Sequence, residues 1–128
     1  MRNPVSPPFI KGETGGAFWR KLMYVRMTLF KLKPGKMQEL RELYNKEVVS
    51  THKGHKGIRF VHLLESLDNK DQGISLTAWD TRADLEAYEK SGDYEKSLAK
   101  FKDMYAADPS LQSYEVTASS DPIILRLF

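Results

Sequence analysis

Apolar and polar residues alternate along residues 24–32, and a Lys-Pro-Gly turn at 33–35 follows directly. A period of two with β-branched and aromatic side chains predicts a strand. Because both of its faces hold bulky apolar side chains, we expect both faces to be covered. One face carries Val25, Met27 and Leu29, and the other carries Arg26, Thr28 and Phe30.

The next apolar residues recur at helical spacing, which predicts a helix that ends before a loop at 52–57. Residues 58–67 and 74–80 are again strand-like. The polar turn at 68–73 between them favours an antiparallel hairpin. The apolar stripe of the helix consists of Met37, Leu40, Tyr44 and Val48.

A second helical segment follows Thr81, which with Asp84 resembles a weak capping box. Residues 91–93 interrupt this segment, and Asp93 is predicted to cap its restart. An Asp-Pro pair at 108–109 ends the segment, and residues 111–118 predict a fourth strand. The helical stripe consists of Leu85, Tyr88, Leu98, Phe101 and Tyr105.

The resulting order of elements over residues 23–118 is β-α-β-β-α-β, which predicts an α+β sandwich of the ferredoxin-like kind. In that arrangement two helices cover one face of a four-stranded antiparallel sheet and leave the other face bare. A symmetric partner is the simplest cover for a second apolar face, so we expect a homodimer.

The two ends of the chain differ from this domain. Residues 1–22 are rich in Pro and Gly without periodicity, which predicts a flexible extension. The stretch at 6–16 resembles a mistranslated intergenic repeat, which would make Met23 the natural start. Residues 119–128 form a tail that is largely apolar from Pro122 onward, and we expect it to pack on the domain or on the partner subunit.

Composition narrows the classes of protein. The chain has 128 residues, 41% of them hydrophobic, which suffices for one core and predicts one site. Its 20 basic and 17 acidic residues are interspersed, which argues against a nucleic-acid partner. It has no cysteine, which excludes disulfides and thiol chemistry. No apolar run approaches the roughly 20 residues that cross a bilayer, so we expect a cytoplasmic protein without a membrane partner.

Trp79 and Arg26 are the leading candidates for a site. On strand parity Trp79 shares a face with Ser75 and Thr77, which predicts a cavity. Trp79 either stacks on a flat ligand or is a core residue whose indole N–H has found a partner. Arg26 on an inner face needs a ligand, water or a carboxylate. The expected partners for a structural ion pair are Glu115 and Glu65.

The histidines and tyrosines add weaker candidates. His62 could act as a general base, although a structural or solvent-facing histidine is the common alternative. His52 and His55 have no third ligand in sight, so we expect no metal there. Any of four tyrosines could line a cleft and donate a proton to a quinol, namely Tyr44, Tyr88, Tyr94 and Tyr105.

The string SLTAWDTRADLEAYEKSGDYEKSL, with the first strand and LKPGKMQEL, resembles the antibiotic biosynthesis monooxygenase (ABM) family over nearly all of residues 23–118. The resemblance implies a dimeric α/β barrel with a pocket between sheet and helices in each subunit. It also implies relatives that oxygenate phenols and quinols without a cofactor, and others that degrade haem. The haem branch combines an Asn, a Trp and a helical His. Here Trp79 fits, Thr28 replaces the Asn, and the second helical segment has no His, which argues against haem.

The leading hypothesis is therefore a monooxygenase-like enzyme that needs no cofactor and acts on a small planar aromatic compound. Arg26 and His62 are the predicted catalytic residues, and Thr28, Trp79 and Tyr88 are predicted to bind the substrate. The alternatives are a non-enzymatic dimer that binds a small hydrophobic ligand, as stress-related proteins do, and a haem-degrading enzyme. An open cavity with an unpaired Arg26 favours the enzyme, whereas a collapsed core with a paired Arg26 favours the binding protein.

Overall fold

The computed structural model describes residues 23–120, without the side chains of residues 51–53. The predictions for residues 1–22 and for the apolar tail from residue 121 onward lie outside the described residues.

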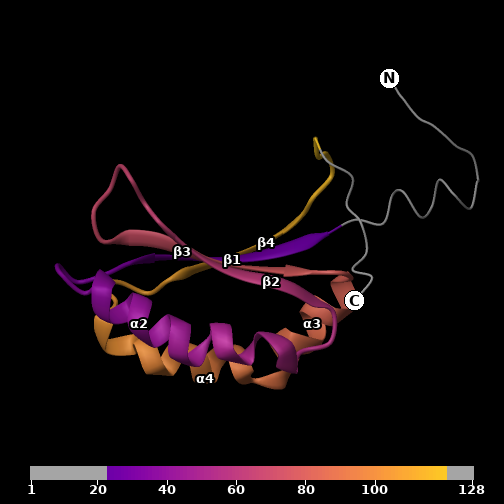
Figure 1. Ribbon diagram of the computed structural model, residues 1–128, viewed down its shortest axis with the longest axis horizontal. Helices are drawn as coiled ribbons and strands as arrows, with labels where there is room; N and C mark the ends of the chain where they lie inside the picture. Colours follow the sequence, from indigo (N-terminus) through magenta and orange to yellow (C-terminus); the bar gives the residue numbers. More distant parts are fainter. Residues whose placement is uncertain (1–22, 121–128) are drawn as a thin grey trace, which may run out of the picture.

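Four strands form one antiparallel sheet in the order β2-β3-β1-β4. Their bounds are β1 (Tyr24–Lys31), β2 (Ile58–Glu65), β3 (Gln72–Trp79) and β4 (Ser110–Glu115). The helices α2, α3 and α4 lie on one side of the sheet (Figure 1). Their bounds are α2 (Met37–Glu47), α3 (Arg82–Ser91) and α4 (Asp93–Phe101), with short 3-10 turns η2 (Val49–Gly54) and η3 (Lys102–Met104). The predicted ferredoxin-like α+β fold is confirmed.

The alternation in β1 has the predicted effect. Arg26, Thr28 and Phe30 are buried under the helices. The register places Met27 beside Leu76 of β3, on the opposite side of the sheet, which no described helix covers. We call this side the open face. Its residues are Val25, Met27, Leu29, Phe60, His62, Leu64, Ile74, Leu76, Ala78 and Tyr114.

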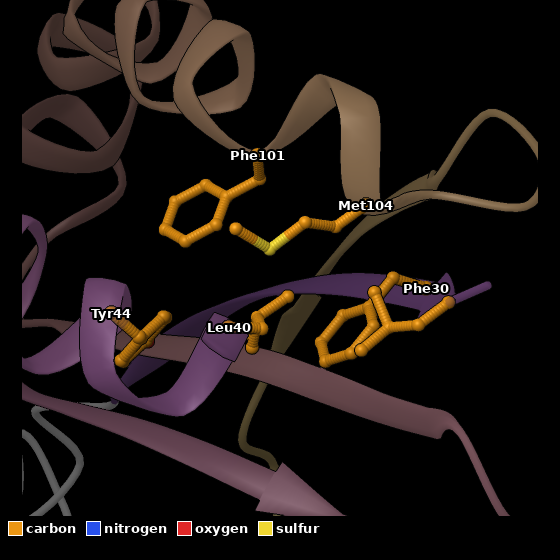
Figure 2. Packing of buried hydrophobic residues seen from close by; sticks show 6 residues of the cluster. Phe30, Leu40, Tyr44, Phe101 and Met104 are labelled. Atoms are coloured by element: carbon orange, nitrogen blue, oxygen red, sulfur yellow. The ribbon is translucent and has the colours of Figure 1, made fainter. Parts of the chain in front are cut away.

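The main core fills the space between the sheet and the helices. Phe30 of β1 meets Leu40 and Tyr44 of α2 (Figure 2). Phe101 and Met104 close the same cluster from the end of α4 and from η3. The predicted apolar stripe of α2 is therefore the part of that helix that faces the core.

The predicted break in the second helical segment is present, but its cap differs. Gly92 has a left-handed φ of 84°, and it, not Asp93, precedes α4 as the N-terminal flanking residue. Glycine adopts this conformation without the steric cost that a side chain brings. At the start of α3 the side chain of Thr81 accepts a hydrogen bond from the Asp84 N–H at 3.0 Å, as predicted.

The remaining differences concern boundaries. The predicted loop at 52–57 begins as η2, β2 ends at Glu65, and β4 spans six residues from Ser110. None of the described helices combines the length and the apolar character that crossing a membrane requires.

Candidate functional site

A cavity of about 50 Å³ lies between the sheet and the helices, and we call it the inner cavity. Polar side chains of the sheet and aromatic side chains of the helices meet there. Its polar side is formed by Arg26, Thr28, Ser75 and Thr77, and its aromatic side includes Tyr44, Tyr88, Tyr94, Tyr105 and Phe101. All four tyrosines that the helical spacing singled out line this one space.

Two pairs of hydroxyl groups link helices to the sheet across the inner cavity. The Thr28 Oγ1 and the Tyr94 hydroxyl are 3.0 Å apart. The Tyr44 hydroxyl lies 2.8 Å from the Ser75 Oγ and donates to the carbonyl of His62 at 3.2 Å. Each hydroxyl can donate as well as accept, so the cavity can offer a donor to an oxygen atom of a ligand.

Arg26 carries the one full charge among the residues that line the inner cavity, and its side chain is 7% exposed. Its guanidinium forms an ion pair with Glu89 of α3 and lies 4.6 Å from the centre of the Tyr94 ring. Burial lowers the pKa of this guanidinium, and the nearby tyrosines Tyr94 and Tyr88 offset part of that lowering. The Nε–H has no hydrogen-bond acceptor among the described residues. Such a buried donor is costly unless a ligand or water accepts from it.

The prediction that Arg26 pairs with Glu115 or Glu65 is wrong. Glu115 lies opposite Tyr24 in the sheet register, at the far end of β1. Glu65 accepts hydrogen bonds from Arg41 at 2.6 and 2.8 Å on the outer surface. The carboxylate that reaches Arg26 comes instead from α3, which packs on β1.

Trp79 is completely buried and is not among the residues that line the inner cavity. Its indole N–H donates to Thr77 Oγ1 at 2.9 Å, and its ring centre lies 5.0 Å from that of Tyr88. The structure thus agrees with the alternative in which Trp79 is a core residue with a satisfied N–H. Tyr88 lies between Trp79 and the cavity and is the ring that a ligand would meet.

His62 does not share this cavity, contrary to the prediction. It pairs with Leu76 on the open face and stacks on Phe60, with ring centres 4.6 Å apart. The cause is an irregularity in β2 between Ile58 and Phe60, which shifts the register by one residue. A shift of one residue moves every following side chain to the other face of the sheet.

A second hollow of about 280 Å³ adjoins the inner cavity, and we call it the outer pocket. The two share Val48, Thr77, Tyr88 and Ser97 as lining residues. Charged side chains surround the outer pocket on α2 and α4. They are Lys46, Glu47, Asp93, Lys96 and Lys100, with His55 beside them.

Burial raises the pKa of Tyr44, Tyr88 and Tyr105 to about 12. For Tyr88 the charge of Arg26 acts in the opposite direction. These hydroxyls therefore keep their protons at neutral pH and can act as hydrogen-bond or proton donors, not as bases.

Alkaline titration is expected to unfold the protein as these tyrosines ionise. The unfolded pKa is about 10, so the folded state binds the protons more tightly, and its stability falls as the pH rises from 10 to 12. Ultraviolet absorbance of tyrosinate and circular dichroism, recorded on one sample, will check this. Ionisation of all six tyrosines near pH 10 with an intact circular dichroism spectrum would contradict it.

Comparisons with known proteins agree with this geometry. The model of the family described as antibiotic biosynthesis monooxygenase matches residues 23–107. No curated protein matches the chain.

Several solved structures share the fold. A Nitrosomonas europaea protein described as a candidate antibiotic biosynthesis monooxygenase is 21% identical, covers 72% of this chain and 88% of its own, and has a TM-score of 0.61. Rv0793 from Mycobacterium tuberculosis is 16% identical, and the match covers 77% of this chain and 99% of Rv0793 with a TM-score of 0.63. A nipsnap family protein of unknown function from Agrobacterium tumefaciens is 12% identical. That match covers 80% of this chain and 96% of the other protein, with a TM-score of 0.61. Identities this low show a common fold alone.

Proposed function

Because the chain belongs to the antibiotic biosynthesis monooxygenase family, we propose that it is a small monooxygenase-like enzyme that acts on a planar, phenol- or quinol-like compound without a metal or organic cofactor. The observation that carries the proposal is the buried Arg26, whose Nε–H has no acceptor among the described residues and whose side chain lines the inner cavity. Substrate oxygen is the acceptor that this donor suits.

The neighbouring residues support a single orientation of the substrate. The substrate hydroxyl lies at the polar side of the inner cavity, where its oxygen accepts a hydrogen bond from the Nε–H of Arg26, and this bond favours the phenolate form. Thr28 and Tyr94, which already contact each other at 3.0 Å, are the additional hydrogen-bonding groups. The aromatic ring of the substrate lies against Tyr88. Trp79 packs on the other side of the Tyr88 ring.

The chemistry then follows from the substrate itself. A phenolate is electron-rich and transfers an electron to dioxygen, and the carbon opposite its oxygen forms the new C–O bond. A phenol and dioxygen give a quinone and one water molecule, which takes the ring hydrogen and the hydroxyl hydrogen. The protein positions the reactants and supplies preorganised hydrogen-bond donors. Tyr44, Tyr88 and Tyr105, whose burial raises the pKa to about 12, can donate the proton that the departing oxygen needs.

Oxygen uptake by the purified protein with a panel of phenols and quinols tests this function. Arg26→Gln is expected to lower kcat/KM at least about 100-fold, the usual effect of removing one preorganised donor. Arg41→Gln is the matched control, because Arg41 also pairs with a glutamate but lies outside the cavity. Oxygen uptake that survives Arg26→Gln, or its absence with every substrate, would contradict the proposal.

Two observations favour a second function. Arg26 is paired with Glu89, and a paired Arg26 is the arrangement expected of a protein that only binds its ligand. The inner cavity of about 50 Å³ is smaller than the roughly 150 Å³ that an engineered cavity offers to benzene. A protein that only binds a ligand in the outer pocket would not need a larger inner cavity. Ligand binding without oxygen uptake is the result that would identify this binding protein.

We also propose that the protein is a homodimer that buries its open face. The apolar residues of the open face support this, because they continue across all four strands and no described helix lies on that side of the sheet (Figure 1). A two-fold axis through this face would bring the two sheets together and give the α/β barrel that the family resemblance implies.

A further inference from the structure

The ring of an aromatic substrate fits the outer pocket better than the inner cavity. The outer pocket offers about 280 Å³, near the lower end of the roughly 300–1,000 Å³ of small-molecule sites. Its apolar wall includes Val48, Ile58, Val61 and the ring of Tyr88. A ring bound there can extend its oxygen past the shared residues Thr77 and Ser97 into the inner cavity.

Both carboxylates that line the outer pocket lie near a basic side chain. Glu47 forms an ion pair with Lys100. The Asp93 Oδ2 lies 3.6 Å from Nε2 of His55. Lys100 therefore balances the charge of Glu47, and Asp93 is the carboxylate among the described lining residues that no ammonium group pairs with.

Two ammonium groups of the outer pocket remain without such a partner. Lys46 of α2 and Lys96 of α4 form no ion pair with any described side chain. The described side chains are those of residues 23–50 and 54–120. The two lysines belong to the two helices that border the pocket, and both side chains line it. The described groups thus leave the outer pocket with a net positive charge.

Arg26, in the inner cavity, offers a ligand a different electrostatic environment. Its positive charge is balanced by Glu89, so a ligand carboxylate beside it would add a buried negative charge without a partner. A hydroxyl or carbonyl oxygen can accept from its Nε–H without that cost.

From these observations we propose that the site selects aromatic acids, with the carboxylate between Lys46 and Lys96 and the hydroxyl oxygen at Arg26. This inference rests on the proposed function, because it assigns the substrate class of the same site. The substrate is then a flat compound with its two oxygen functions at opposite ends.

Paired probes of equal shape test the charge selection. We expect the full-length protein to bind 2-naphthoate about tenfold more tightly than 2-naphthamide in titration calorimetry, as two exposed ion pairs allow. The double variant K46M/K96M should lose this preference and keep its affinity for 2-naphthamide. The control K90M/K102M removes two exposed lysines outside both hollows and should keep the preference.

Salt gives an independent readout. Raising the ionic strength from about 0.01 M to about 1 M shortens the screening length from about 30 Å to about 3 Å, so it should weaken naphthoate binding alone. Equal affinities of wild-type protein for the two probes would overturn the charge selection and leave the proposed function standing. If neither probe binds, both the inference and the proposed site for planar compounds are overturned.

Discussion

Replacement of Trp79 by alanine is expected to lower the free energy of unfolding by about 4 kcal/mol. The side chain is completely buried and forms a small core cluster with Ile58 and Leu85. Its loss leaves a hole that the neighbouring strand and helix can fill only in part, and it removes the indole donor from Thr77. Urea denaturation at fixed protein concentration, followed by circular dichroism, measures the change.

Trp79→Phe is the matched control for this prediction. It keeps an aromatic ring and loses the N–H, so we expect a cost below about 2 kcal/mol. If Trp79→Ala instead leaves stability nearly unchanged while ligand affinity falls, Trp79 stacks directly on the ligand, and the structural role assigned to it is wrong.

Substitution of Leu76 by glutamate is expected to raise the dissociation constant of the proposed dimer at least about 1,000-fold. Leu76 is on β3, between Met27 of β1 and His62 of β2 on the open face. Two-fold symmetry would place both new carboxylates in the same apolar interface, so the desolvation cost is incurred twice. Sedimentation velocity over a range of concentrations will show the shift to monomer.

Ala87→Glu introduces the same charge at an exposed position of α3, and this control should leave the dimer intact. In the monomer Leu76 is only half-buried, so the glutamate variant should still fold. A wild-type protein that is monomeric at high micromolar concentration, or a Leu76→Glu variant that stays dimeric, would contradict the proposed dimer.

The sequence predicted the parts of the site that regular strands control. β1 pairs with β3 and β4 without interruption, so a period of two suffices to put Arg26 and Thr28 on one face. The same regularity places Ser75 and Thr77 of β3 opposite them. The spacing of Tyr88 on the second helical segment also predicted its inward orientation.

His62 shows where such a prediction fails. In a regular β2, residues 58, 60 and 62 would share a face, and Ile58 lies on the inner side opposite Trp79. The irregularity before Phe60 reverses this, and nothing in the local residue pattern marks it. A single extra residue in a strand thus separates a predicted catalytic residue from its predicted site.

The partners of Arg26 were missed for a different reason. Helical spacing shows which residues share a face of a helix, but it does not show which strand position each one meets. Glu89 lies on α3 before the break at Gly92 and Tyr94 lies on α4 after it, so the approach of Tyr94 to β1 depends on the direction that this break gives to α4. The one available signal was an acidic residue one position after Tyr88 on a helix already expected to cover the sheet.

The order of the strands has a consequence for how the chain acquires its structure. β1 is an interior strand, and its register joins Tyr24 to Glu115 and to Trp79. Among the described strands β1 is synthesised first, and it completes its pairing only when β4 has emerged from the ribosome. Proteins dominated by such distant pairings fold more slowly than helical proteins of similar size. Until β4 arrives, one edge of β1 exposes unpaired amide and carbonyl groups, and the nascent chain is at its most vulnerable to aggregation during that interval.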